Sequence, residues 1–151
     1  MKILMVCLGN ICRSPMAEGL LSQKVTNHKL PIEVDSAGTS GYHIGESPDS
    51  RMIETAKSFG VNIENLKARQ FIVSDFDTFD FIYAMDASNY ANIILLARTD
   101  ADRNKVHLIL NELEPGKNLE VPDPYFGGEK GFIEVFKMLD EATDQIIKKI
   151  K

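Results

Sequence analysis

The first fourteen residues constrain the fold of this chain more than any other segment. The largely apolar run from Lys2 to Val6 predicts a buried strand, and it leads directly into Cys7-Leu8-Gly9-Asn10-Ile11-Cys12-Arg13-Ser14. A strand, a short turn and a helix N-terminus together form an anion-binding site, because the first N–H groups of a helix have no partner within it. Five residues between Cys7 and Arg13 are enough for the chain to curl around a tetrahedral oxyanion. The segment therefore predicts a phosphate-binding loop.

Cys7 and Arg13 have the side-chain chemistry that such a loop needs. A cysteine near a helix N-terminus and a guanidinium has a stabilised thiolate, so its pKa falls from roughly 8.5 and the thiolate can attack phosphorus near neutral pH. The donor fork of Arg13 matches two phosphoryl oxygens, a geometry that lysine lacks. Gly9 and Asn10 suit the turn, because both residue types tolerate a positive φ.

Ser14 and Pro15 are typical of a helix start, with a hydroxyl at the N-cap and proline at the first helical position. The surrounding loop favours a second role, in which the Ser14 hydroxyl donates to the Cys7 thiolate. The segment Ser47-Pro48-Asp49 repeats the cap-and-proline pattern, with Asp49 as favourable charge at a helix N-terminus. Asp86 is most simply another helix N-cap.

Strand-like and helix-like patterns alternate along the chain. Strands are predicted at residues 2–6, 32–36, 79–85 and 106–110, and helices at 15–27, 52–59, 90–97 and 132–150. This alternation favours an α/β fold with a parallel sheet, helices on both faces, and ligands at the carboxyl ends of the strands. A length of 151 residues is that of one domain, which we place at 1–151.

The run from Cys7 to Pro15 resembles the active-site loop of the low-molecular-weight protein tyrosine phosphatases. A bare Cys-to-Arg spacing is a weak signal, but the full string and its place after the first strand make the resemblance specific. A second motif, Val121-Pro122-Asp123-Pro124-Tyr125-Phe126, resembles the general-acid loop of the family. Asp123 would protonate the departing phenol oxygen, whereas the alternative for this segment is a proline-rich surface turn.

The resemblance extends over nearly the whole chain and implies further site residues. Ser36 would support the phosphate loop near Asn10, or it would be only a turn residue at a strand end. Tyr42 and Tyr125, with Phe126 beside the latter, would form the substrate rim, unless these aromatic rings merely pack down their own loops. The resemblance also implies four parallel strands in the order 2-1-3-4.

Two positions raise questions about this resemblance. Many family members carry histidine where this chain has Leu66, and in them the histidine belongs to the hydrogen-bond network beneath the loop. Its absence puts the stiffness of the loop in question. The resemblance also implies that Cys12 can capture an oxidised Cys7 as a reversible disulfide, although a buried small hydrophobe is an equal alternative.

Composition restricts the cellular compartment and the classes of partner that we expect for this chain. With 17 basic and 22 acidic residues the net charge is −5, which does not favour nucleic acid as a partner. No stretch approaches the ~20 apolar residues of a membrane span, and two cysteines in one loop suit a reducing cytoplasm rather than a disulfide framework. His28, His43 and His107 lack ligand-like spacing, so we expect neither a metal nor a cofactor. We expect a cytoplasmic monomer.

The favoured function is hydrolysis of phosphotyrosine in proteins, and of small aryl phosphates, through a phosphocysteine intermediate that finally releases phosphate. Protein-arginine phosphatases are a close alternative, but they typically carry threonine where this chain has Ile11. Arsenate reductases need further cysteines, and none follows Cys12. A non-catalytic phosphotyrosine-binding module would have little need for Cys7, Arg13 and Asp123 together.

Overall fold

One parallel sheet organises the molecule. The computed structural model describes residues 1–151, apart from the side chain of Phe126. Four parallel strands, β1 (Lys2–Cys7), β2 (Glu33–Gly38), β3 (Phe81–Ala84) and β4 (Val106–Leu108), lie in the order β2-β1-β3-β4. The predicted single-domain α/β class and strand order are confirmed.

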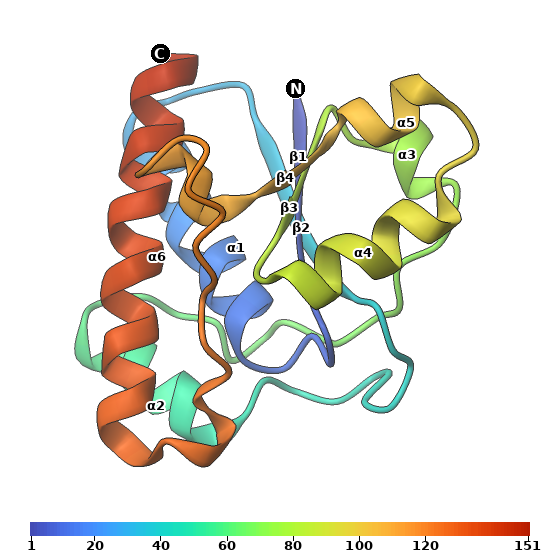
Figure 1. Cartoon of the computed structure of the whole chain (residues 1–151). Coiled ribbons are helices and arrows are strands. Elements are labelled where there is room, and N and C mark those ends of the chain that lie inside the picture. Colours follow the sequence, from blue (N-terminus) through green and yellow to red (C-terminus); the bar gives the residue numbers. More distant parts are fainter.

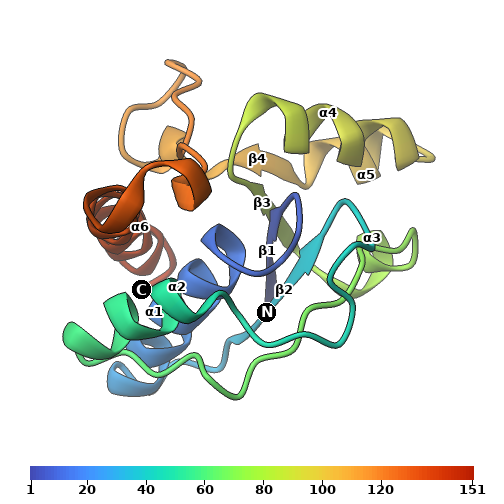
Figure 2. The ribbon, with the colours of Figure 1, turned by 90° about the horizontal axis from the view of Figure 1, so that it is seen from below.

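Helices cover both faces of this sheet (Figures 1 and 2). On one face lie α1 (Arg13–Asn27), α2 (Ser50–Ser58) and the long α6 (Gly128–Ile150), and on the other lie α3 (Asp75–Thr78), α4 (Ala87–Leu96) and α5 (Asp100–Asn104). Two short 3₁₀ helices, η1 (Ile109–Glu112) and η2 (Pro124–Phe126), belong to the connections that lead from β4 to α6.

Strand β1 shows why this arrangement is stable. Its side chains alternate between the two faces, as strand geometry requires. Ile3 and Met5 pack into the core beneath α1 and α6, whereas Leu4 and Val6 pack into the core beneath α3 and α4. All four are fully buried, so β1 is the buried strand predicted by its largely apolar run.

Several predicted element ends differ from the structure. Helix α1 begins at Arg13, so Ser14 lies inside the first turn; no side chain caps this helix, and the prediction of Ser14 as N-cap is wrong. Asp49 itself caps α2 by accepting from the N–H of Arg51. The fourth strand ends at Leu108, because residues 109–112 turn into η1.

The carboxyl end of β1 is where the chain crosses to begin α1, and the loop between them occupies the edge of the sheet predicted for ligands. The ends of β2 and β3 lie beside it, since both pair with β1. Among the described residues, no helix combines the length and the apolar character that a bilayer crossing requires.

Candidate active site

The phosphate loop connects β1 to α1 and is held around the sulfur of Cys7. Asn10 adopts a left-handed conformation with φ of 58°, which is the strained turn that the sequence predicts. This conformation directs the Asn10 N–H at Cys7 Sγ, 3.3 Å away. Cys7 is only 3% exposed, at the floor of the loop.

Ser14 lies directly against the nucleophile. Its Oγ is 3.0 Å from Cys7 Sγ, and it accepts a hydrogen bond of 2.8 Å from the Asn10 side-chain amide. The same hydroxyl lies 3.5 Å from the carbonyl of Ala37, a longer contact than the one with the sulfur. The geometry therefore suits donation from Ser14 to a Cys7 thiolate.

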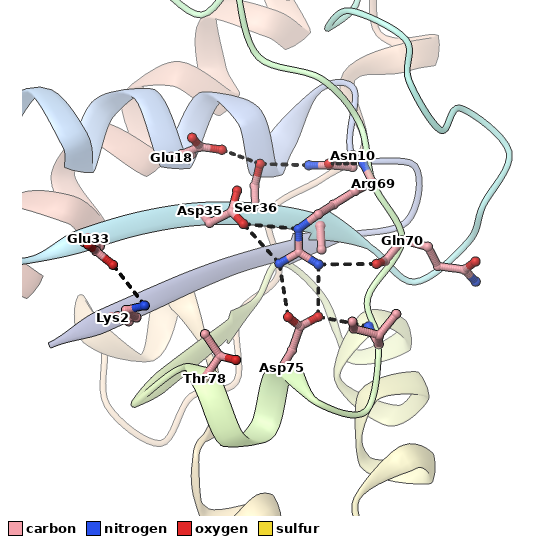
Figure 3. Close-up of polar contacts among 12 residues, drawn as sticks. Lys2, Asn10, Glu18, Glu33, Asp35, Ser36, Arg69, Gln70, Asp75 and Thr78 are labelled. Carbon is pink, nitrogen blue, oxygen red and sulfur yellow. Dashed lines mark hydrogen bonds and ion pairs between the residues drawn. The ribbon is translucent and has the colours of Figure 1, made fainter.

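The Asn10 side chain has a hydrogen-bond partner at each polar atom, and Figure 3 shows it beside Ser36 and Arg69. Its amide nitrogen donates to Ser36 Oγ at 2.9 Å as well as to Ser14, and its Oδ1 accepts from the backbone N–H of Arg69 at 3.0 Å. Ser36 Oγ in turn donates to Glu18 Oε1 at 2.6 Å. Ser36 thus lies where the resemblance places the loop support.

Leu66 packs against the main hydrophobic core. The Asn10 side chain obtains its hydrogen bonds from Ser14, Ser36 and the backbone of Arg69 instead. The effect of Leu66 on the stiffness of the loop stays a prediction.

Arg69, whose backbone N–H donates to Asn10, is bound through its side chain to α3 and β2 (Figure 3). Its guanidinium donates two hydrogen bonds to the buried carboxylate of Asp75 in α3, at 3.1 and 3.2 Å, and another of 3.1 Å to Asp35 in β2. Its carbonyl accepts from the N–H of Gly38 at the end of β2. The Arg69 N–H is therefore a fixed donor for Asn10.

Arg13 is buried at the wall of the loop, with 4% of its surface exposed. Its Nη1 donates to Asp86 Oδ2 at 2.7 Å and to the carbonyl of Val121 at 2.9 Å. Burial alone would lower the pKa of Arg13, but the charges of Cys7 and Asp86 outweigh it, so the pKa is raised. These two bonds occupy Nη1, which leaves Nε and Nη2 as donors for an anion.

Asp86 has two functions, of which the sequence indicated only one. Its Oδ1 caps α4 by accepting from the N–H of Asn89 at 2.7 Å, as predicted. Its Oδ2 also pairs with Arg13, and this contact between the end of β3 and the phosphate loop was missed. A carboxylate at the carboxyl end of a strand next to β1 is the signal that could have indicated it.

Asp123 comes to the same cavity from the other end of the chain. The segment before it is fixed to the sheet by a hydrogen bond from the N–H of Val121 to the carbonyl of Met85, at 2.9 Å. Asp123 Oδ1 accepts from the N–H of Tyr125 at 3.0 Å and so caps η2. This leaves Oδ2 as the oxygen available to carry a transferable proton.

A single cavity collects most of the predicted site. Its lining residues are Cys7, Leu8, Gly9, Ile11, Cys12, Arg13, His43, Asp123 and Tyr125.

His43 in this lining was not predicted as a site residue. Its ring lies next to Gly9, where an added Cβ would come within 3.0 Å of it, and its Nδ1 lies 2.8 Å from Glu46 Oε2. The preceding Tyr42 is 82% exposed and outside the lining, so its role at the rim stays a prediction. Phe126, also predicted for the rim, has its side chain outside the described residues.

Cys12 is buried beside the nucleophile, and both cysteines are free thiols. Burial, followed by the negative charge of Asp49, raises the pKa of Cys12 well above its ordinary value. The raised pKa keeps Cys12 in its thiol form at neutral pH, which does not suit a nucleophile. Among the described side chains, no group of three or more His, Cys, Asp or Glu residues is arranged to hold a metal ion.

Known proteins share this arrangement over the full chain. Residues 2–151 match the family model described as low molecular weight phosphotyrosine protein phosphatase. The low molecular weight phosphotyrosine protein phosphatase of Schizosaccharomyces pombe is 40% identical over 152 residues, which cover 99% of this chain and 96% of the relative.

Solved structures agree with this assignment. A protein tyrosine phosphatase from Entamoeba histolytica superposes with a TM-score of 0.93 at 42% identity, covering 99% of this chain and 96% of the other. The Drosophila arginine phosphatase DARP superposes with a TM-score of 0.92 at 33% identity, covering 100% and 98% respectively. The chain therefore belongs to the low-molecular-weight protein tyrosine phosphatase family, whose members are hydrolases that act on phosphotyrosine.

Proposed function

We propose that this protein removes phosphate from phosphotyrosine in proteins through a phosphocysteine intermediate. The observation that carries the proposal is the convergence of Cys7, Arg13 and Asp123 on one cavity. A nucleophile, a cation for the phosphoryl oxygens and an acid for the leaving group are the three parts that phosphate-ester cleavage requires.

In the first step the Cys7 thiolate attacks phosphorus, and the bond from phosphorus to the tyrosine oxygen breaks. Arg13 Nε and Nη2, together with the inward N–H groups of the loop, hold the phosphoryl oxygens as charge develops on them. Asp123 Oδ2 transfers its proton to the departing phenolate, so tyrosine leaves as a neutral phenol.

In the second step water attacks the phosphocysteine. The Asp123 carboxylate takes a proton from this water, the sulfur–phosphorus bond breaks, and phosphate leaves. The Cys7 thiolate is regenerated and accepts hydrogen bonds from Ser14 and from the Asn10 N–H. The loop thus stabilises the charge of both the free nucleophile and the bound phosphoryl group.

Turnover of a phosphotyrosyl peptide by wild type and by Cys7→Ser tests this proposal. We expect hydrolysis by the wild type only, while the variant still binds phosphate because Arg13 and the loop amides remain. Phosphate binding is measured by calorimetry on the same samples. Equal hydrolysis by both proteins would refute Cys7 as the nucleophile.

Arginine phosphatase activity is the second candidate, supported by the similarity to DARP. The apolar Ile11 side chain lines the cavity, however, together with Leu8 and Tyr125. This apolar lining favours an aromatic ester. A charged phosphoguanidinium would lose its hydration against the same lining, which costs free energy. We expect a higher kcat/KM for phosphotyrosine than for phosphoarginine in peptides of otherwise identical sequence.

A further inference from the structure

The loop that carries Asp123 is held at both of its ends. Its beginning is fixed by the Val121 carbonyl, which accepts from Arg13, and by the Val121 N–H, which donates to Met85. Its far end is Tyr125, whose N–H donates to Asp123 Oδ1. The Pro124 carbonyl, in the same peptide group as this N–H, accepts from the N–H of Gly127 at 3.0 Å. The orientation of the Asp123 carboxyl therefore depends on the contacts that hold Pro124 and Tyr125.

Arg51 in the first turn of α2 contacts this far end. Its Nη1 donates to the Tyr125 carbonyl at 3.4 Å, and its guanidinium lies over the Tyr125 ring, 5.1 Å from the centroid. The same guanidinium lies 4.7 Å from the ring centroid of Phe132 in α6. Arg51 thus contacts both the acid loop and the helix that follows it.

The guanidinium is oriented from its other side by Asp49. Nε donates to Asp49 Oδ1 at 3.1 Å and Nη2 to Oδ2 at 3.0 Å, which is a bidentate pair. These hydrogen bonds lower the pKa of Asp49, so both partners are charged at neutral pH. A bidentate pair fixes the plane of the guanidinium, which a single contact would leave free to rotate.

Asp49 in turn is attached to the phosphate loop. Its N–H donates to the carbonyl of Ile11 at 2.8 Å. A continuous set of contacts therefore leads from the nucleophile loop, through Asp49 and Arg51, to Tyr125, whose N–H donates to the Asp123 carboxyl. Figures 1 and 2 show α2 beside the start of α6, where these segments meet.

We propose that Arg51 is a positioning residue for the general acid, which sets the placement of Asp123 relative to Cys7 without touching the substrate. The proposal rests on the proposed role of Asp123. Arg51 has 44% of its side chain exposed, so solvent screens its pairing with the largely buried Asp49 and the pair contributes little to stability. The effect of removing Arg51 should therefore appear in the reaction rather than in folding.

Leaving-group dependence distinguishes positioning from a general structural effect. Nitrophenolate is a good leaving group and departs with little help, whereas phenolate needs a proton from Asp123. Displacing a catalytic group by about 1 Å can cost up to about 100-fold in rate. A misplaced Asp123 should therefore slow phenyl phosphate much more than p-nitrophenyl phosphate.

The experiment compares kcat/KM for these two substrates in wild type, Arg51→Met and Arg51→Lys. For Arg51→Met we expect about a tenfold loss with phenyl phosphate and less than about a twofold loss with p-nitrophenyl phosphate. Arg51→Lys keeps the charge but loses the bidentate fork, so we expect an intermediate loss for phenyl phosphate. Lys57→Met, which removes an exposed cation from the same helix, should leave both values unchanged.

A double variant completes the test. In the Asp123→Asn background, Arg51→Met should cause no further loss, because the group it positions is already disabled. Equal losses for the two substrates, or additive losses in the double variant, would overturn the role of Arg51. If Asp123→Asn itself shows no leaving-group dependence, or if the wild type hydrolyses neither ester, the proposed function fails instead. Thermal melts confirm that each variant is folded.

Discussion

We expect the free energy of unfolding to depend on pH through Glu18, which accepts a hydrogen bond from Ser36 beneath the phosphate loop. Burial raises its pKa to about 7 from an ordinary 4.5, and the negative charge of Asp35 adds to this. The hydrogen bond from Ser36 and the charge of Arg69 act in the opposite direction but do not outweigh burial. Because the folded state binds this proton more tightly than the unfolded state, the free energy of unfolding should fall as pH rises from about 4.5 to 7.

The size of this effect follows from the two pKa values. At about 1.4 kcal/mol for each tenfold change in proton affinity, the upper limit is about 3.4 kcal/mol. Glu18 is partly exposed, so solvent screening reduces the expected value to about 1–2 kcal/mol. Glutamine at this position keeps the acceptor for Ser36 without the charge. Glu18→Gln should therefore be more stable than wild type by that amount at pH 8, and nearly equal to it at pH 5.

Urea unfolding of both proteins from pH 5 to pH 8 measures this difference. Glu141→Gln, at an exposed position of α6, is the matched control and should follow the wild type throughout. A Glu18→Gln curve that stays parallel to the wild-type curve over the whole range would refute the reasoning, because the buried carboxyl would then not titrate differently on folding.

Three further predictions concern the loop itself. Arg13→Lys keeps a cation beside Asp86 but loses the fork, so kcat/KM for aryl phosphates should fall by about 100-fold or more while the protein stays folded; an unchanged value would contradict this. Asn10→Ala should lower the free energy of unfolding by about 2 kcal/mol in chemical denaturation, because the left-handed turn and buried partners lose their support; an unaltered midpoint would count against it. After peroxide converts Cys7 to a sulfenic acid, the Cys12 thiol should displace water to form a disulfide. Cys12→Ser should then recover less activity in dithiothreitol than wild type, and equal recovery would exclude that role.

The local parts of the site could be predicted from the sequence because their residues are contiguous. Cys7 to Arg13 form one loop, and the left-handed turn at Asn10 follows from the side chain that occupies it. The strand order agrees with the structure as well, but it was implied by the family resemblance and not by a local pattern. The loop and its turn depend on short-range patterns, which a single sequence records directly.

The contacts that hold the site in place could not be predicted in the same way. Asp86 with Arg13, and Arg69 with Asn10, join residues far apart in sequence, so no spacing rule indicates them. The prediction of Ser14 as helix cap was wrong because the sulfur and Asn10 compete for its hydroxyl. The contacts of Ser14 with Cys7 and Asn10 therefore override the preference of serine for the N-cap position.

Trapping of a phosphoenzyme tests the central claim most directly. A phosphotyrosyl substrate labelled with ³²P is mixed rapidly with enzyme, quenched in the millisecond range and digested for peptide mapping. The account predicts label on Cys7 in the wild type, and none in Cys7→Ser. Release of phosphate by the wild type with no covalent label, or label on a residue other than Cys7, would contradict the proposed mechanism.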